Sequence, residues 1–151
     1  MHEAKIIIPN TAKAPGDAAR ALQFALKACA STFGGYTATQ AQGGWINDAG
    51  ELIEEPVTVI TVAYDPNAGV DGDEALRWIA LRVGRIAAQD CVYVQQPDGE
   101  VILYPTRELW DKEIVRPKGK TVELEIVRPK GKTVELEIVR PKGKTVELKV
   151  G

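Results

Sequence analysis

Two neighbouring carboxylates, Glu54 and Glu55, are the most obvious candidates for chemistry in this chain of 151 residues. Acid–base catalysis by a carboxylate pair needs both groups within reach of the same reacting atoms. Both residues fall in a predicted strand, where successive side chains point to opposite faces of the sheet. His2 is the only histidine and lies at the terminus, so a histidine-based triad is excluded. We therefore expect no catalytic residues and a protein that is not an enzyme.

Aromatic side chains are the second group of candidates. Flat apolar rings line many small-molecule sites, and they also stack on nucleic-acid bases. The residues that could line such a groove are Tyr36, Trp45, Tyr64 and Tyr93, with Trp45 nearly opposite Ile53 in a predicted hairpin. The alternative is that these rings belong to the core or to one face of the sheet, and the sequence leaves both interpretations open.

The two cysteines carry no metal or redox signature. Cys29 and Cys91 are far apart, and neither belongs to a Cys-x-x-Cys pair. We expect both to be buried free thiols in a reducing cytoplasm, with no metal and no cofactor. No apolar run approaches the length of a membrane span, and the N-terminus has no signal-peptide pattern.

Charge and composition divide the chain near Lys112. Residues 1–112 hold 9 basic and 15 acidic residues, a net charge of −6, whereas residues 113–151 hold 10 and 6, a net charge of +4. All 18 alanines precede the boundary. We therefore predict a globular domain over 1–112 and a separate repeat segment over 113–151. The acidic character of the domain argues against nucleic-acid binding.

The pattern of apolar residues predicts the elements of the domain. Strands are expected at 5–9, 36–47, 51–64, 91–96 and 100–104, and helices at 17–33 and from Asp71 to about residue 87. Gly43-Gly44 predicts a bulge or a close backbone approach. Asp71 and Glu74 have the spacing of a capping box. The order β-α-β-β-α-β-β favours an α+β domain of the ferredoxin-like class.

Each predicted helix has an apolar stripe at helical spacing. In the first helix the stripe comprises Leu22, Ala25, Leu26, Cys29 and Phe33. In the second it comprises Leu76, Ile79, Ala80, Val83, Ile86 and Ala87. Three arginines, Arg77, Arg82 and Arg85, lie off the second stripe, and we expect them to be solvated.

The segment 113–148 is one twelve-residue unit, EIVRPKGKTVEL, written three times. Each unit alternates apolar and polar residues and then turns at Pro-Lys-Gly, which suits a three-residue hairpin loop. An antiparallel meander is favoured, and a β-solenoid with one unit per coil is the alternative. The meander places on one face Val122, Leu124, Ile126, Val134, Leu136, Ile138, Val146 and Leu148.

Several short motifs resemble those of small hypothetical proteins of tailed phages and bacteria. The resemblance covers residues 4–104 and leaves out the repeats. The motifs are Lys5-Ile6-Ile7-Ile8-Pro9, Phe33-Gly34-Gly35-x-Thr37, Gly44-Trp45, Gly50-Glu51, Glu55-Pro56-Val57 and Gln89-x-x-Val92-Tyr93-Val94. The resemblance implies a compact α+β domain of phage or bacterial origin, and it assigns no catalytic residues.

The apolar face of the repeats leads the functional interpretation, because a lone four-stranded sheet cannot bury it. We expect a non-enzymatic structural or interaction protein that forms a homo-oligomer or filament through its repeat strands, in the cytoplasm of a bacterial host if it is encoded by a phage. The alternative is a small-molecule-binding protein that sequesters a metabolite through residues 1–112.

Overall fold

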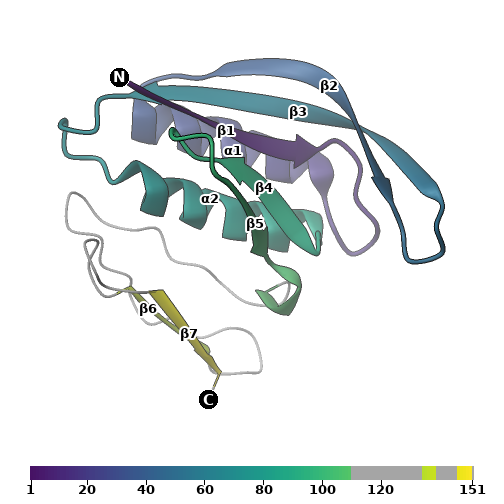
Figure 1. The fold of residues 1–151 in the computed structure, drawn as a ribbon. Helices are drawn as coiled ribbons and strands as arrows, with labels where there is room; N and C mark the ends of the chain where they lie inside the picture. Colours follow the sequence, from purple (N-terminus) through teal and green to yellow (C-terminus); the bar gives the residue numbers. More distant parts are fainter. Residues whose placement is uncertain (110–133, 139–145, 151) are drawn as a thin grey trace.

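The computed structural model describes residues 1–109, 134–138 and 146–150. In chain order the elements are β1 (His2–Pro9), α1 (Ala18–Phe33), β2 (Thr37–Ile46), β3 (Leu52–Tyr64), α2 (Gly72–Ala87), β4 (Cys91–Gln95), β5 (Val101–Pro105), the 3-10 turn η1 (Arg107–Leu109), β6 (Val134–Ile138) and β7 (Val146–Val150). Strands β1 to β5 form one antiparallel sheet with two helices (Figure 1), so the predicted α+β class is confirmed.

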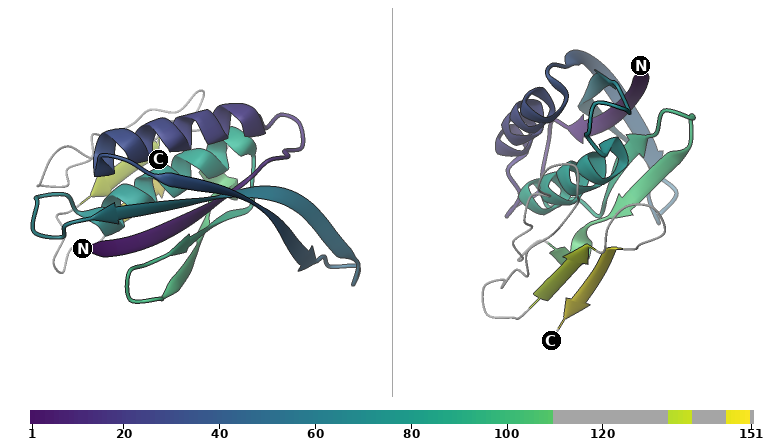
Figure 2. Two further views of the ribbon diagram at one scale, coloured as in Figure 1. Left: turned by 90° about the horizontal axis from the view of Figure 1, so that it is seen from above. Right: turned by 90° about the vertical axis from the view of Figure 1, so that its left-hand side faces the viewer.

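The sheet has the strand order β2-β3-β1-β4-β5. The apolar run at residues 5–9 lies in the central strand β1, which pairs with β3 on one side and with β4 on the other. Both helices lie on the same face of the sheet (Figure 2). In the part of the chain that the structure describes, no helix lies over the other face of the sheet, and β2 is exposed along almost its whole length.

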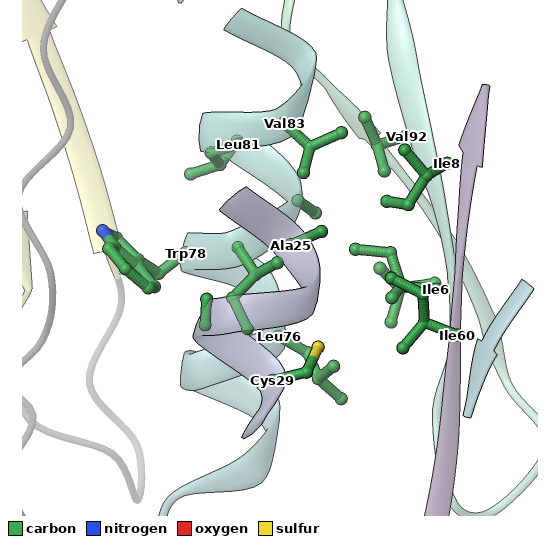
Figure 3. Packing of buried hydrophobic residues seen from close by; sticks show 14 of the residues in the cluster. Ile6, Ile8, Ala25, Cys29, Ile60, Leu76, Trp78, Leu81, Val83 and Val92 are labelled. Atoms are coloured by element: carbon green, nitrogen blue, oxygen red, sulfur yellow. The ribbon is translucent and has the colours of Figure 1, made fainter. Parts of the chain in front are cut away.

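The core lies between the sheet and the two helices. Ile6 and Ile60 from the sheet meet Leu76 from α2, and all three are fully buried (Figure 3). The face that α1 buries differs from the prediction. Its buried residues are Ala21, Ala25, Ala28 and Cys29, whereas Leu22, Leu26 and Phe33 are only partly buried. Small side chains lie against the core, and the larger ones flank them.

Helix α2 begins at the predicted cap. The Asp71 carboxylate accepts a hydrogen bond from the backbone N–H of Glu74 at 3.1 Å. The expectation that the arginines of this helix are solvated is wrong, because Arg77, Arg82 and Arg85 are all partly buried. Arg77 pairs with Glu74 at 3.9 Å, and the Arg82 guanidinium lies 5.3 Å from the centre of the Phe24 ring. Their long apolar stems lie along neighbouring side chains.

Part of the repeat segment is described as the antiparallel pair β6–β7. Leu136 lies opposite Leu148 and Glu137 opposite Glu147, which is the register that the Pro-Lys-Gly loop predicts for these two strands. The other strands of the meander, with Val122, Leu124 and Ile126, lie outside the described residues, as does the boundary near Lys112. The full meander therefore stays a prediction. Within the described residues, neither helix is long and apolar enough to cross a membrane.

Candidate functional site

The hairpin β2–β3 runs on beyond the layer of helices (Figures 1 and 2). Its turn fixes the register. The Asn47 side-chain oxygen accepts hydrogen bonds from the N–H groups of Ala49 and Glu51, and Gly50 takes a positive φ of 79°. Trp45 lies opposite Ile53, as predicted, and the ladder continues without a break to Thr37 and Thr61.

A closed ring of three polar side chains lies where this hairpin passes the end of β1. The Asn10 amide donates to Gln40 at 2.8 Å, the Gln40 amide donates to the Thr58 hydroxyl at 3.2 Å, and that hydroxyl donates to Asn10 at 2.8 Å. Thr58 is only 1% exposed. The backbone N–H of Asn10 also donates to the Pro56 carbonyl at 2.9 Å. These bonds tie the residues after β1 to both strands of the hairpin.

The next residue of the chain, Thr11, brings a hydroxyl to a carboxylate. Thr11 Oγ1 lies 3.3 Å from Glu55 Oε2, and the Glu55 side chain is partly buried. Glu55 follows the odd-numbered residues of β3, whereas the even-numbered Thr58 and Ile60 face the helices. The Glu55 carboxylate therefore lies on the helix-free face of the sheet, and the ring of Asn10, Gln40 and Thr58 lies on the other face.

Paired glycines stand opposite the paired glutamates. Gly43 faces Glu55 and Gly44 faces Glu54 in an unbroken ladder, so the bulge that the glycines were expected to mark is absent from this hairpin. A Cβ atom at Gly43 would come within 3.2 Å of the Val57 side chain. Neither glycine carries a side chain, and the side chains of Val57 and Leu52 lie close to the positions that Cβ atoms would take at Gly43 and Gly44. Glu54 and Glu55 point to opposite faces, as predicted.

Trp45 lies further along the same strand. It is two residues from Gly43 and so shares the face of Glu55, and its side chain is 53% exposed. Diagonal neighbours on an antiparallel pair are about 7–8 Å apart at Cα, which is within reach of long side chains. The exposed indole and the carboxylate bonded to Thr11 are thus diagonal neighbours on one face of the hairpin. Such a pair can stack against a flat ring and bind a cation.

The four predicted aromatic residues do not form one groove. Tyr64 is buried at the far end of β3, where its ring packs 5.1 Å from that of Phe33. Eleven residues of strand separate it from Ile53, opposite Trp45, a distance on the order of 35 Å. Tyr36 is exposed just before β2, and Tyr93 lies on the helix-free face opposite Ile7. A role in ligand binding for each residue singly stays a prediction.

Sequence reasoning missed the Thr11 hydroxyl beside Glu55, and it missed the ring of Asn10, Gln40 and Thr58 on the other face. They come from three segments, and their hydrogen bonds join residues up to 48 apart in the sequence. One signal was present. The predicted pairing of Trp45 with Ile53 also places Gly43 opposite Glu55, so the glycine pair faces the carboxylate pair.

Burial affects the two thiols and one tyrosine hydroxyl of the domain. Burial raises the pKa of the Cys29 thiol to about 12, and burial together with Asp90 raises that of Cys91. Cys91 is exposed, so the expectation that both thiols are buried is wrong for this residue. Burial raises the pKa of Tyr64 to about 12, helped by Asp73 and Asp71. In the described part of the chain, no group of three or more His, Cys, Asp or Glu side chains could hold a metal.

Comparison with known proteins gives one informative result. No family model and no curated protein matches the chain. The chain is similar in structure to a phage SAM lyase in complex with S-methyl-5′-thioadenosine, with a TM-score of 0.52 and 15% identity over 68% of this chain and 88% of that chain. The apo state of a phage SAM lyase matches with a TM-score of 0.48 and 12% identity over 68% and 87%. The first match shows a shared fold.

This likeness corrects two expectations. The prediction of a non-enzymatic protein relied on the lack of a recognisable catalytic motif in this sequence. A phage SAM lyase, which is an enzyme, shares the fold, and this finding contradicts the prediction. The leading interpretation, a structural protein that self-associates through its repeats, is overturned by the same finding. The predicted resemblance to phage proteins is confirmed at the level of the fold.

Proposed function

We propose that residues 1–109 bind S-adenosylmethionine and cleave it as a lyase, as part of a phage or bacterial accessory protein that acts in the host cytoplasm. The observation that supports the proposal is the similarity of the fold to a lyase that holds S-methyl-5′-thioadenosine, across 88% of that chain. On the strand order, we assign the arrangement of β1 to β4 to the ferredoxin-like class.

The chemistry of this substrate matches the pair formed by Trp45 and Glu55. S-adenosylmethionine joins an adenosine to an amino acid through a positively charged sulfonium. When the bond between the sulfur and the amino-acid chain breaks, its electron pair goes to sulfur and S-methyl-5′-thioadenosine leaves. The substrate's own carboxylate oxygen can bond to the released carbon and close a lactone, so the step needs no further reactant. A site for this molecule needs a flat apolar surface for the adenine and an anion for the cationic part. Trp45 offers the first and Glu55 the second.

Glu55 is better assigned to the ammonium group of the substrate than to its sulfonium. The charge on sulfur disappears as the bond breaks, so a carboxylate against sulfur would stabilise the substrate more than the transition state. The ammonium group keeps its charge throughout. A carboxylate on the ammonium therefore holds the substrate without opposing cleavage, and Thr11 keeps that carboxylate in place.

The second candidate function is binding without cleavage, which is the sequestering role. The observation that favours it is the exposure of the candidate site, because the Trp45 side chain is 53% exposed. Enzymes commonly exclude water from the reacting atoms, whereas a sequestering protein needs only affinity.

One experiment separates the two functions. The full chain is incubated with S-adenosylmethionine, binding is measured by calorimetry and S-methyl-5′-thioadenosine by mass spectrometry. A lyase releases this product, and a sequestering protein binds without releasing it. Absence of both binding and product would refute the proposal.

Glu55→Gln and Glu54→Gln are the matched variants. They remove the same charge from neighbouring positions on opposite faces of β3. A hydrogen bond to a charged group contributes about 1.5–3 kcal/mol, so we expect Glu55→Gln to weaken binding by about 10–150-fold. We expect Glu54→Gln to change binding less than twofold. Equal effects of the two variants would contradict the assignment of Glu55.

A further inference from the structure

Helix α2 is buried on the side that points away from the sheet. Leu76 and Val83 face the core and are fully buried. At about 100° per residue, Trp78 and Leu81 lie roughly 200° and 140° around the helix from Leu76. Both are nevertheless only 7% exposed. Figure 3 shows Trp78 on the side of α2 away from the sheet. In a two-layer domain a helix exposes this side to solvent, so the burial of Trp78 and Leu81 calls for further residues packed over them.

Trp78 contacts the neighbouring helix α1 through Phe24. The centres of the Phe24 and Trp78 rings lie 5.4 Å apart in an edge-on arrangement, and the Arg82 guanidinium lies 5.3 Å from the centre of the Phe24 ring. Leu81 lies further round the helix, away from Phe24. We call Trp78 and Leu81 the outer face of α2.

The hairpin β6–β7 has an apolar face that needs a partner. Alternate residues place Val134, Leu136 and Ile138 on one face of β6, opposite Val150, Leu148 and Val146 of β7. An isolated two-stranded hairpin is marginally stable in water and needs an apolar partner. Figures 1 and 2 place this hairpin on the α2 side of the domain. In Figure 3 the Trp78 side chain points toward the ribbon of the hairpin.

The chain segment between η1 and β6 allows the hairpin to reach α2. The described domain ends at η1, which packs against α2, so the chain leaves the domain next to the helix in question. Residues 110–133 join η1 to β6, which is ample length to reach any point of α2. The two parts also carry opposite net charges, −6 for residues 1–112 and +4 for residues 113–151, which favours their association.

We propose that the outer face of α2 is a docking surface for the apolar face of β6–β7 of the same chain. The repeat hairpin then forms a third layer on the domain, sheet on helices on sheet. A tethered partner is present at high effective concentration, so the contact forms without a second copy.

The test uses the full chain with Trp45→Phe and Trp110→Phe, so that Trp78 is its only tryptophan. Two double variants are compared in this background. Leu136→Gln with Leu148→Gln alters the apolar face of the hairpin, and Glu137→Gln with Glu147→Gln places the same residues on its polar face. We expect the first pair of changes to shift Trp78 emission to longer wavelength and to raise its acrylamide quenching several-fold. We expect no change from the second pair.

A reciprocal measurement keeps the result independent of how stable the altered hairpin is. Leu81→Gln should speed hydrogen exchange in peptides covering residues 134–150, while Lys27→Gln, at an exposed position of α1, should not. Unchanged Trp78 emission in both double variants, or unchanged exchange with Leu81→Gln, would overturn the proposal. Protection of Trp78 that depends on protein concentration would also overturn it, because the partner would then be a second copy.

Discussion

Gly84 is the position where helix propensity and packing predict opposite effects. It lies within α2 and is buried against Thr106, the residue between β5 and η1. A methyl group at Gly84 would overlap with Oγ1, Cβ and Cγ2 of Thr106. Rotation of the threonine side chain cannot relieve the overlap, because Cβ is attached directly to the backbone.

The two effects can be compared in magnitude. Glycine inside a helix is less favourable than alanine by about 0.5–1 kcal/mol, so propensity alone predicts that Gly84→Ala stabilises. Overpacking a core costs about 1–3 kcal/mol and occasionally more. Thr106 has little freedom to move, since its N–H donates to Asp90 at 2.9 Å and its hydroxyl donates to Gln89 at 2.6 Å. We therefore expect Gly84→Ala to lower the free energy of unfolding by about 1–3 kcal/mol net.

Urea denaturation of the full chain measures this effect. Thr106→Gly removes the side chain that the new methyl group meets, so Gly84→Ala should cost less in that background. The coupling energy in the double-mutant cycle should reach about 1 kcal/mol or more, as expected for residues in contact. If Gly84→Ala instead stabilises the protein, or the two changes are additive, then α2 does not pack on Thr106 as described.

Three further predictions follow from single groups. Thr58→Val keeps the shape of a buried side chain and removes a hydroxyl with two hydrogen bonds, so it should cost about 1–2 kcal/mol in urea denaturation, and a neutral result would mean that the ring with Asn10 and Gln40 contributes nothing. Ala88→Gly should stabilise by about 0.4–1 kcal/mol in the same assay, because Ala88 ends α2 with a φ of 51° that glycine adopts without strain. The third concerns pH: burial, Asp71 and Asp98 raise the pKa of Asp73 above its ordinary 3.8, so its protonated form favours folding and that contribution is lost as the pH rises through the folded-state pKa. The melting temperature of Asp73→Asn relative to the unaltered chain should therefore rise between acid and neutral pH, and a difference that falls over this range would reverse the inferred sign.

Local pattern was enough to predict the elements of the domain. The cap at Asp71, the helix over 17–33 and the strand over 51–64 all follow from residues a few positions apart, and the structure has them. The burial within α1 was predicted less well. The large residues Leu22 and Leu26 outweighed Ala21 and Ala28 in the apolar stripe, yet the alanines are the buried ones. Sequence periodicity locates an apolar face but does not say how close the neighbouring layer comes.

The candidate site was beyond local pattern because three distant segments build it. Thr11 meets Glu55 across 44 residues, and Asn10 meets Thr58 across 48. Neither contact has a sequence signature, since threonine and asparagine after a strand are ordinary loop residues. Only the register of β1 against β3 brings them together, and that register depends on the apolar faces of both strands being buried at once.

The failed prediction of a non-enzymatic protein has a related physical cause. Motifs identify enzymes whose chemistry needs a nucleophile, a metal or a phosphate cradle at fixed spacing. S-adenosylmethionine already carries a positively charged sulfur as a good leaving group, so a protein that cleaves it needs mainly to bind and orient it. Orientation can come from one indole, one carboxylate and a hydroxyl that holds the carboxylate, placed by the register of a hairpin. The proposed lyase chemistry would leave few marks of this kind in a sequence.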